Sequence, residues 1–549
     1  MLAKGRILYK DIWYLYPPAA PYFNSFLYRL LGTRLEVTYI AGSLSALGSA
    51  VFLYLSGIRL SSRLAGWVTA VVVLLQTFES GIFNFPFPYS YASVYGCFTA
   101  CFFLWLLLTA CESPGTGLKL GLGFTAAIAL LLKMEFGAAC YAALTMFILQ
   151  RAIAQRSWSR LFQDLAAALP GVALCGWVVH WMISLGGIDF LIQENLMSWP
   201  TSYFMHTYGK FWLAHTGMEI SGQAIVEACK RGAALAAGLF TLYVIFFWKA
   251  KGVRRFLLPC GLLLTMMALA LRIPFLNLDT SLRSLFFPQD MVLYASLAAL
   301  PAWFMFWRKA RSPRWAAFAL LFTFSGLLAV RILLKNGPAG YPVYYNGPAI
   351  LSFLLLMFLG IGYFAPSVRS RFWGELILCA ACLFTVGYHT FHFMTVRKSA
   401  LSLLTTERGN IWLKKADADN YSAALRFMKA HNTNDQTVLL LPEDTAVYFL
   451  SSTSSPNRIF EFVPGILAPG PMTGKLLREL DAKPPHFLLW SNRVFPEYGA
   501  PIFGKDFDRP LGDFFKARYH RLGLLPPHSG SFGDWQAAVW ERNPDGALP

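Results

Sequence analysis

The sequence predicts an α-helical polytopic membrane protein, a bundle of about twelve spans, followed by a small C-terminal α/β domain. Of its 549 residues, 56% are apolar and only 14% are charged, which lies outside the usual composition of soluble proteins. Long apolar runs recur up to about residue 395, and shorter apolar runs alternate with helical patterns after it. These two patterns divide the chain into a membrane part, residues 36–395, and a water-facing part, residues 396–549.

The formal net charge of +18 raises the question of nucleic acid as a partner. The basic residues are scattered in short clusters between apolar runs, however, and do not line one soluble face. The sequence therefore predicts no nucleic-acid binding, and it predicts contact with membrane lipid.

The first element is the N-terminal stretch, residues 1–35, which is rich in aromatic rings and prolines. It is too polar and too often interrupted by proline to span a bilayer, and it lacks the apolar run and cleavage site of a signal peptide. Tyrosine and tryptophan rings favour the headgroup level of a membrane. Because the run from Tyr22 to Leu31 is amphipathic, we expect an extracytoplasmic loop with an interfacial helix.

This N-terminal stretch follows the pattern G-x-x-x-Y-x-D-x-x-x-x-x-P-P and continues into a helix that ends R-L-L-G. It resembles the first extracytoplasmic loop of the GT-C membrane glycosyltransferases, the group that includes protein mannosyltransferases and aminoarabinose transferases. The matching residues are Gly5, Tyr9, Asp11, Pro17, Pro18 and Gly32.

The resemblance implies a GT-C type bundle that moves a sugar from a polyprenyl-phosphate donor to an acceptor. In that group an acidic pair upstream of the Gly-x-x-x-Tyr element lies at the catalytic centre, and this chain begins after that position. Many members also have a Lys before the double proline, where this chain has Tyr16. We therefore expect that the sequence lacks the first transmembrane helix and its acidic motif, and that Asp11 is the acid left in the loop.

Ten apolar runs in the membrane part are long enough to cross the hydrocarbon core as a helix, which needs about 20 residues. Two further helices, between residues 117 and 154, meet at Lys133, Met134 and Glu135. The ten runs fall near 36–57, 64–82, 91–111, 162–186, 231–249, 254–272, 288–307, 314–334, 348–365 and 371–394.

The loops at alternate ends of these spans differ in charge, since one set holds sixteen Lys and Arg residues and the other eight. The richer set is expected to be cytoplasmic, which places both termini and the C-terminal domain outside. The N-terminal stretch carries five basic residues against one acid, which disfavours translocation unless a further helix precedes it. The localisation predicted is a multi-pass protein of a bacterial inner membrane.

Lys133 and Glu135 interrupt a hairpin that is otherwise uncharged around them. The 15 residues from Leu118 to Leu132 reach only about 22 Å as a helix, which is less than a hydrocarbon core of about 30 Å. Ionisable groups below the membrane surface are costly and mark functional sites, although a polar turn with a snorkelling lysine is the alternative. Residues two apart do not face each other on a helix, so separate partners are expected rather than a local ion pair.

The loop from Phe83 to Tyr91 alternates aromatic rings with prolines and Asn84. An aromatic belt explains the rings, and a platform for a sugar ring or a prenyl chain is the sharper hypothesis. Tyr345 belongs to another outside loop, between the apolar runs near 314–334 and 348–365, and this loop could contribute to the same substrate site.

After residue 395, apolar runs of strand length occur at Thr437 to Leu441 and at His486 to Trp490. Helical patterns occur at Tyr421 to Ala430 and at Thr473 to Leu480. This alternation predicts a small extracytoplasmic α/β domain, and about 150 residues suffice for a core of its own.

The function predicted is sugar transfer from a polyprenyl-phosphate donor to a lipid, glycan or protein at the outer face of the membrane. A polytopic transporter or lipid flippase is the alternative, since it would also explain many spans and a buried charged pair. An acid would take the proton of the acceptor hydroxyl, and cations would stabilise the departing lipid phosphate. The residues predicted for these roles are Asp11 and Glu135 for catalysis, Lys133, Arg272 and Arg283 for the donor phosphate, and Tyr9, Tyr14, Tyr16, Asn84, Phe85, Tyr89 and Tyr345 for the substrates.

No cofactor is predicted with certainty, and a divalent metal is left open. His389 and His392 stand three apart near the end of the last apolar run, where interfacial histidines are favoured over a metal site because no carboxylate or cysteine is near in sequence. The C-x-x-C pair Cys379 and Cys382 lies within an apolar run and is interpreted as small core residues.

Overall fold

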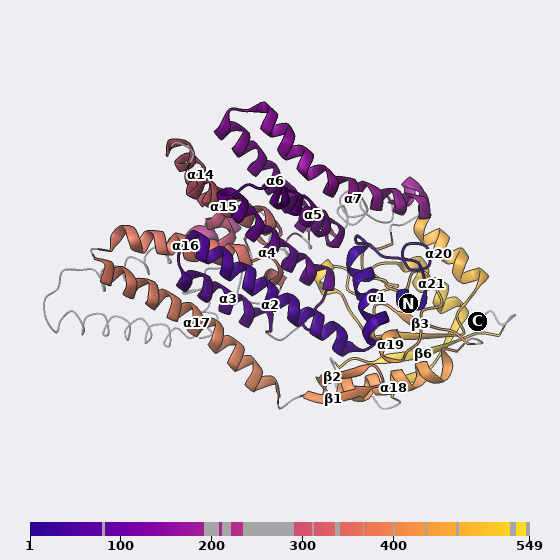
Figure 1. Ribbon diagram of the computed structural model, residues 1–549. Helices are drawn as coiled ribbons and strands as arrows, with labels where there is room; N and C mark the ends of the chain where they lie inside the picture. The colour runs from indigo at the N-terminus through magenta and orange to yellow at the C-terminus, as the bar shows by residue number, and fades with distance from the viewer. Residues whose placement is uncertain are drawn as a thin grey trace. The chain divides into compact units, whose positions relative to one another are not determined.

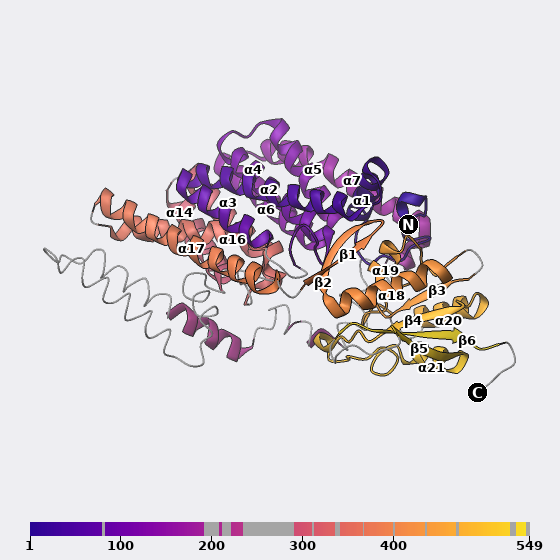
Figure 2. The ribbon, with the colours of Figure 1, turned by 90° about the horizontal axis from the view of Figure 1, so that it is seen from below.

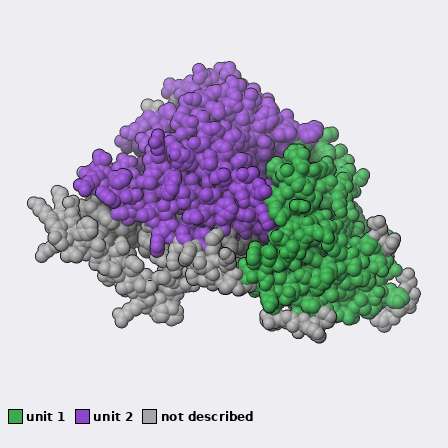
Figure 3. Space-filling view, turned by 60° about the horizontal axis from the view of Figure 1, so that its bottom comes forward, with its two compact units in different colours: residues 1–38, 178–215, 396–549 green, residues 39–177, 216–395 purple. Residues whose placement is uncertain are grey.

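The computed structural model describes thirteen segments of the chain, which divide into two compact units (Figure 3). Unit 1 comprises residues 1–38, 178–215 and 396–549, and unit 2 comprises residues 39–177 and 216–395. The described residues are 1–78, 83–191, 208–210, 213, 221–233, 290–309, 312–334, 341–365, 367–398, 401–433, 436–467, 471–526 and 534–544.

Unit 2 is built from apolar helices that fall where the long apolar runs predicted them (Figure 1). The predicted runs near 231–249 and 254–272 lie outside the described residues. The helices are α2 (Leu35–Leu60), α3 (Arg63–Thr77), α4 (Tyr91–Glu112), α5 (Thr116–Leu132), α6 (Met134–Gln155), α7 (Trp158–Phe190), α14 (Met291–Arg308), α15 (Pro313–Leu328), α16 (Gly347–Phe364) and α17 (Val368–Lys398), of which α2, α7 and α17 extend into unit 1.

Five of the described helices are long and apolar enough to cross a membrane, namely α2, α4, α6, α7 and α14. Four shorter helices, α3, α5, α15 and α16, are also apolar. The helix α4 is the most enclosed of the long ones, with 72% of its apolar window buried, so it forms the centre of unit 2. The prediction of about twelve spans stays a prediction.

Unit 1 contains a four-stranded sheet in the order β3-β4-β6-β5 (Figure 2). The first pair is parallel, whereas β6 runs antiparallel to both of its neighbours, and an antiparallel hairpin, β1-β2, precedes the sheet. The strands are β1 (Leu401–Thr406), β2 (Gly409–Lys414), β3 (Val438–Leu441), β4 (Phe487–Ser491), β5 (Tyr519–Leu525) and β6 (Ala537–Arg542); the helices are α1 (Ala19–Leu31), α18 (Lys415–His431), α19 (Thr445–Leu450), α20 (Pro471–Ala482) and α21 (Arg509–Arg518).

The sheet of unit 1 is covered by helices on both faces (Figure 2). Leu439 and Leu488, which are paired across β3 and β4, share an apolar core with Leu480 of α20 and Phe515 of α21. Phe487 points to the opposite face and contacts Phe427 of α18, with ring centroids 5.6 Å apart. Successive strand residues alternate between faces, so the predicted strand and helix patterns are confirmed as an α/β arrangement.

The N-terminal stretch packs into unit 1. The predicted interfacial helix is present as α1, and Trp13 joins the same apolar core as the sheet. The backbone N–H of Trp13 donates to the carbonyl of Arg458 at 3.0 Å, and the Arg458 Nε donates to the carbonyl of Tyr9 at 3.0 Å. Segments about 450 residues apart in sequence therefore fold as one body.

Candidate functional site

The junction between α5 and α6 places Lys133 in the interior of unit 2. Helix α5 ends at Leu132 and α6 begins at Met134, while Lys133 itself is extended, with φ −161° and ψ 130°. The turn is tight, since a Cβ on Gly137 would lie 2.2 Å from the Cα of Leu130. The prediction that two helices meet here is confirmed, and the Lys133 side chain is only 2% exposed.

The ammonium group of Lys133 is held by hydroxyl groups and one carboxylate. Its Nζ donates to Ser93 Oγ at 2.8 Å and to Tyr345 OH at 3.3 Å, and it lies 3.2 Å from Glu135 Oε1. The expectation of separate partners for Lys133 and Glu135 is therefore wrong. The helical spacing rule fails here because Lys133 is extended, so the two side chains converge.

Glu135 also binds a cation that the sequence analysis did not assign to the site. Arg331 NH1 donates to Glu135 Oε1 at 2.9 Å, and Tyr345 OH donates to the same oxygen at 2.9 Å. The Arg331 guanidinium lies 4.8 Å from the ring centroid of Tyr341, and the Tyr341 and Tyr345 hydroxyls are 2.9 Å apart. We call Ser93, Lys133, Glu135, Arg331, Tyr341 and Tyr345 the Lys133 cluster.

A signal for Arg331 was present in the sequence. The apolar run predicted as a span over residues 314–334 includes Arg331, and a charge within a span marks a functional site. In the structure α15 ends at Leu328, and Arg331 follows in a short 3-10 turn, Val330–Ile332. The other predicted phosphate-binding cations, Arg272 and Arg283, lie outside the described residues.

The Lys133 cluster has more positive than negative charge. Two cations, Lys133 and Arg331, share one carboxylate, Glu135, which leaves a formal charge of +1. Burying charge is costly unless it is paired, so this excess favours an additional anion. The side chains of Arg331 and Glu135 are 20% and 27% exposed, so an anion that enters the cluster meets Arg331 before Lys133.

Aromatic rings form the walls of the cluster. Phe136 stacks on Tyr345 with centroids 4.9 Å apart, and this placement requires Gly96, since a Cβ there would lie 2.7 Å from the Phe136 ring. Phe83, from the predicted aromatic loop, packs edge-on against Tyr341 at 5.8 Å.

The three predicted substrate residues of that loop differ in accessibility. Phe85 is fully buried and packs against Tyr344, and the Asn84 Oδ1 accepts the backbone N–H of Phe87 at 2.6 Å. Tyr89 is exposed. Both interpretations of the loop, an aromatic belt and a substrate platform, stay open for Tyr89.

The predicted site residues of the N-terminal stretch belong to unit 1. The Asp11 carboxylate accepts the backbone N–H of Ile7 at 2.8 Å and closes a turn around Tyr9, whose φ is +70°. The Tyr9 hydroxyl donates to the carbonyl of Tyr16 at 2.8 Å, and the Tyr14 and Tyr16 rings pack edge-on at 5.7 Å. The prediction that Asp11 is a catalytic residue stays a prediction.

The described residues include His, Cys, Asp and Glu, whose side chains are common metal ligands. In that part of the chain no three His, Cys, Asp or Glu side chains come together in a metal-binding arrangement. His389 and His392 fall on α17, but their side chains lie outside what the structure describes.

Taken together, the fold and the cluster define a helical membrane protein with a buried, net-positive site and an α/β unit. No family model matches the chain, and no curated protein matches it. Among solved structures, it is similar to the archaeal oligosaccharyltransferase AglB from Archaeoglobus fulgidus in complex with an inhibitory peptide and a dolichol-phosphate, with 12% identity, a TM-score of 0.46, and coverage of 98% of this chain and 68% of that chain.

Two further structures are similar to the chain. The apo form of the Archaeoglobus fulgidus oligosaccharyltransferase has 12% identity and a TM-score of 0.44, over 87% of this chain and 62% of that one. The apo state of ArnT from Cupriavidus metallidurans has 12% identity and a TM-score of 0.36, over 96% and 88%. The chain thus spans about two thirds of the length of the oligosaccharyltransferases. All three are GT-C glycosyltransferases, the group that the N-terminal stretch resembles.

Proposed function

We propose that this protein is a membrane glycosyltransferase that moves a sugar from a polyprenyl-phosphate donor to an acceptor at the outer face of a bacterial inner membrane. The observation that carries the proposal is the Lys133 cluster, in which two cations share one carboxylate inside a unit of apolar helices. A lipid phosphate would supply the missing negative charge. The Gly-x-x-x-Tyr-x-Asp pattern of the N-terminal stretch adds independent support.

In this proposal Arg331 contacts the donor phosphate, because it is the more accessible of the two cations. Guanidinium groups bind phosphate through two parallel hydrogen bonds. Lys133 is more deeply buried than Arg331, and its charge stabilises the negative charge that develops on the departing phosphate. Glu135 accepts from Arg331 and lies beside Lys133, so it positions both cations.

Asp11 is proposed as the general base, whose carboxylate takes the proton of the acceptor hydroxyl. Its carboxylate is partly exposed and one oxygen accepts the Ile7 N–H, which fixes its orientation. The acceptor oxygen then attacks the anomeric carbon of the donor sugar as the bond from that carbon to the phosphate oxygen breaks.

The proposal is tested with Arg331→Met and Lys133→Met in the purified full-length protein. Both substitutions keep an apolar stem and remove the charge, so each should lower turnover of a polyprenyl-phosphate sugar by about a hundredfold. Arg331→Met should also weaken donor binding. The controls are Arg371→Met and Lys230→Met, whose side chains are exposed and lie in separate ion pairs; they should leave both quantities unchanged.

If both cluster variants keep wild-type turnover and donor affinity, the cluster is a structural polar turn. If the wild-type protein moves the lipid across a bilayer without breaking the sugar–phosphate bond, the transporter or flippase alternative holds instead.

A further inference from the structure

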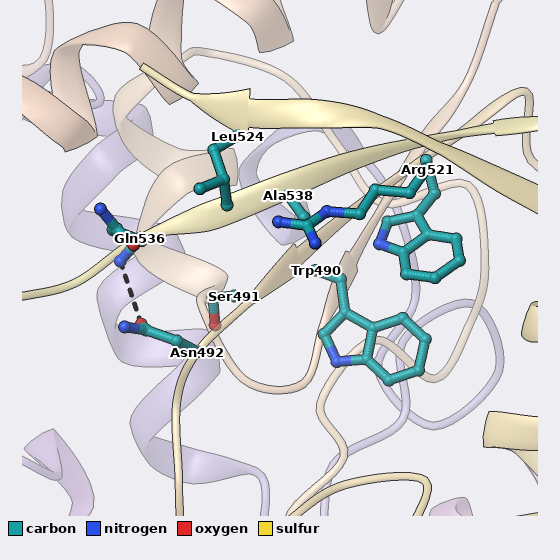
Figure 4. A pocket seen from close by; sticks show the side chains of 8 residues that line it. Trp490, Ser491, Asn492, Arg521, Leu524, Gln536 and Ala538 are labelled. Carbon is teal, nitrogen blue, oxygen red and sulfur yellow. Dashed lines mark hydrogen bonds between the residues drawn. The ribbon is translucent and has the colours of Figure 1, made fainter. Parts of the chain in front are cut away.

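A hollow with an apolar floor and one polar end lies in unit 1, on the sheet face that α20 and α21 cover (Figure 4). Its volume is about 250 Å³, which is below the roughly 300–1,000 Å³ of sites for drug-sized ligands and suits one small ring. It is lined by Trp490, Ser491, Asn492, Arg521, Gln536 and Trp540, together with two aliphatic side chains.

The strand register explains why the lining residues meet. Trp540 of β6 pairs with Arg521 of β5, and Trp490 of β4 pairs with Ala538 of β6. Directly paired residues point to the same face of a sheet, so the two indoles and the guanidinium converge. The two indole centroids are 5.7 Å apart, with planes inclined at 38°.

Packing behind the hollow fixes the indole of Trp490. Phe503 and Phe515 contact it edge-on at 5.5 and 6.4 Å, and the hollow itself lies within unit 1. A ring held in this way needs no reordering when a ligand stacks on it, which lowers the entropic cost of binding.

The polar end of the hollow lies where β4 ends. The Asn492 Oδ1 accepts the backbone N–H of Gln536 at 3.0 Å, which closes this end (Figure 4). Ser491 donates its hydroxyl hydrogen to the half-buried Asp444, and Asp444 also accepts from Trp535 Nε1 at 2.8 Å. Ligands commonly bind beyond the carboxyl ends of parallel strands, and β3 and β4 are the parallel pair here.

Two polar groups at the hollow retain unused donors. The buried Gln536 Nε2 has no hydrogen-bond partner among the described residues, and a buried donor without a partner costs free energy. Arg521 is exposed, and within the described part of the chain its guanidinium makes no hydrogen bond or ion pair; Figure 4 shows it extending across the sheet toward the hollow. A ligand with acceptor oxygens would give the exposed Arg521 guanidinium partners.

We propose that this hollow binds one acidic sugar ring of the acceptor, a ring that carries a carboxylate or phosphate. The apolar face of a sugar packs on an indole, its hydroxyls face the polar end formed by Ser491 and Asn492, and its acidic group pairs with Arg521. Because the two indole planes are inclined at 38°, a flat nucleobase cannot stack on both rings at once. That the bound sugar belongs to the acceptor rests on the proposed transferase activity. The binding of an acidic sugar to the hollow does not depend on that activity.

The test measures sugar binding to the purified full-length protein by ligand-observed NMR, without donor. The probes are methyl β-D-glucuronide, the neutral methyl β-D-glucoside and adenosine monophosphate. We expect the glucuronide to bind about tenfold more tightly than the glucoside, as one charge-assisted contact predicts. Arg521→Gln should abolish that preference, whereas Lys516→Gln, which removes an exposed charge of the same domain, should keep it.

Absence of glucuronide binding, an unchanged preference in Arg521→Gln, or tighter binding of adenosine monophosphate would overturn the inference. The Lys133→Met variant separates the two proposals, since it should lose transfer and keep glucuronide binding. Intact transfer without sugar binding refutes only this hollow. Sugar binding in a wild-type protein that transfers no sugar refutes only the transferase.

Discussion

At one end of the α5/α6 hairpin, Lys133 and Arg331 share the carboxylate of Glu135, and at the other end Lys119 and Arg151 share the carboxylate of Asp164. The two groups have the same charges. They differ in which charge is enclosed, since Asp164 is the buried member of its group, whereas Lys133 is the buried member of the other.

This difference separates a structural group from a candidate binding site. In the Asp164 group the most enclosed charge is the carboxylate, which has two cations beside it, and the group joins α5, α6 and α7. A buried lysine with hydroxyls and a shared carboxylate leaves its charge partly uncompensated. The charge count of the loops predicts that the Asp164 end is cytoplasmic and the Lys133 end external.

The largest expected effect is on stability, at Asp164. Asp164→Asn leaves Lys119 and Arg151 enclosed without a counter-charge, which should cost about 3 kcal/mol of unfolding free energy. The measurement is the Tm of the purified protein. Glu112→Gln is the control, because Glu112 pairs with Arg59 at an exposed position and such pairs contribute about 1 kcal/mol or less. Equal Tm changes in the two variants would show that the buried Asp164 contributes no more to stability than the exposed Glu112.

A third carboxyl, the half-buried Glu461 of unit 1, has an acidic neighbour in place of cations. Burial and the nearby Glu443 raise the pKa of Glu461 to about 7, whereas the unfolded chain loses this proton near about pH 4. Between these values the folded state binds more protons, so the free energy of unfolding should fall as pH rises.

We expect that fall to be on the order of 2 kcal/mol between about pH 5 and about pH 8, and to be smaller in Glu461→Gln. Denaturant unfolding of the full-length protein at several pH values measures it. Glu407→Gln, at an exposed ion pair with Lys429, serves as the control and should keep the wild-type slope. A Glu461→Gln variant with that same slope would show that Glu461 does not carry the effect.

The smallest expected effect tests the hydroxyls that distinguish the Lys133 cluster. Tyr345→Phe keeps the ring stacked on Phe136 but removes the hydroxyl that contacts both Lys133 and Glu135. Turnover should fall by about tenfold, the effect of one hydrogen bond to charged groups, with little change in Tm. Tyr141→Phe, which removes only a 3.8 Å contact to Cys175, should have wild-type turnover. Similar turnover in both variants would argue against a functional role for the tyrosine hydroxyl.

The sequence by itself determined the positions of the described apolar helices, the junction at Lys133 and the strands β3 and β4 of unit 1. Each of these features depends on local composition and on spacing along one segment: a helix repeats every 3.6 residues and a strand every two. The same local information identified Lys133 and Glu135 as an unusual pair, because charge within an apolar hairpin is visible without a structure.

Only the tertiary structure decided which groups meet. Arg331 reaches Glu135 across 196 positions, Trp13 enters the core of the C-terminal sheet, and Arg521 joins two tryptophans through the register of β4, β5 and β6. The local rule for Lys133 and Glu135 failed because one extended residue redirected its side chain. Such contacts depend on how distant segments pack and on backbone angles at single residues, and neither follows from the periodicity of a sequence.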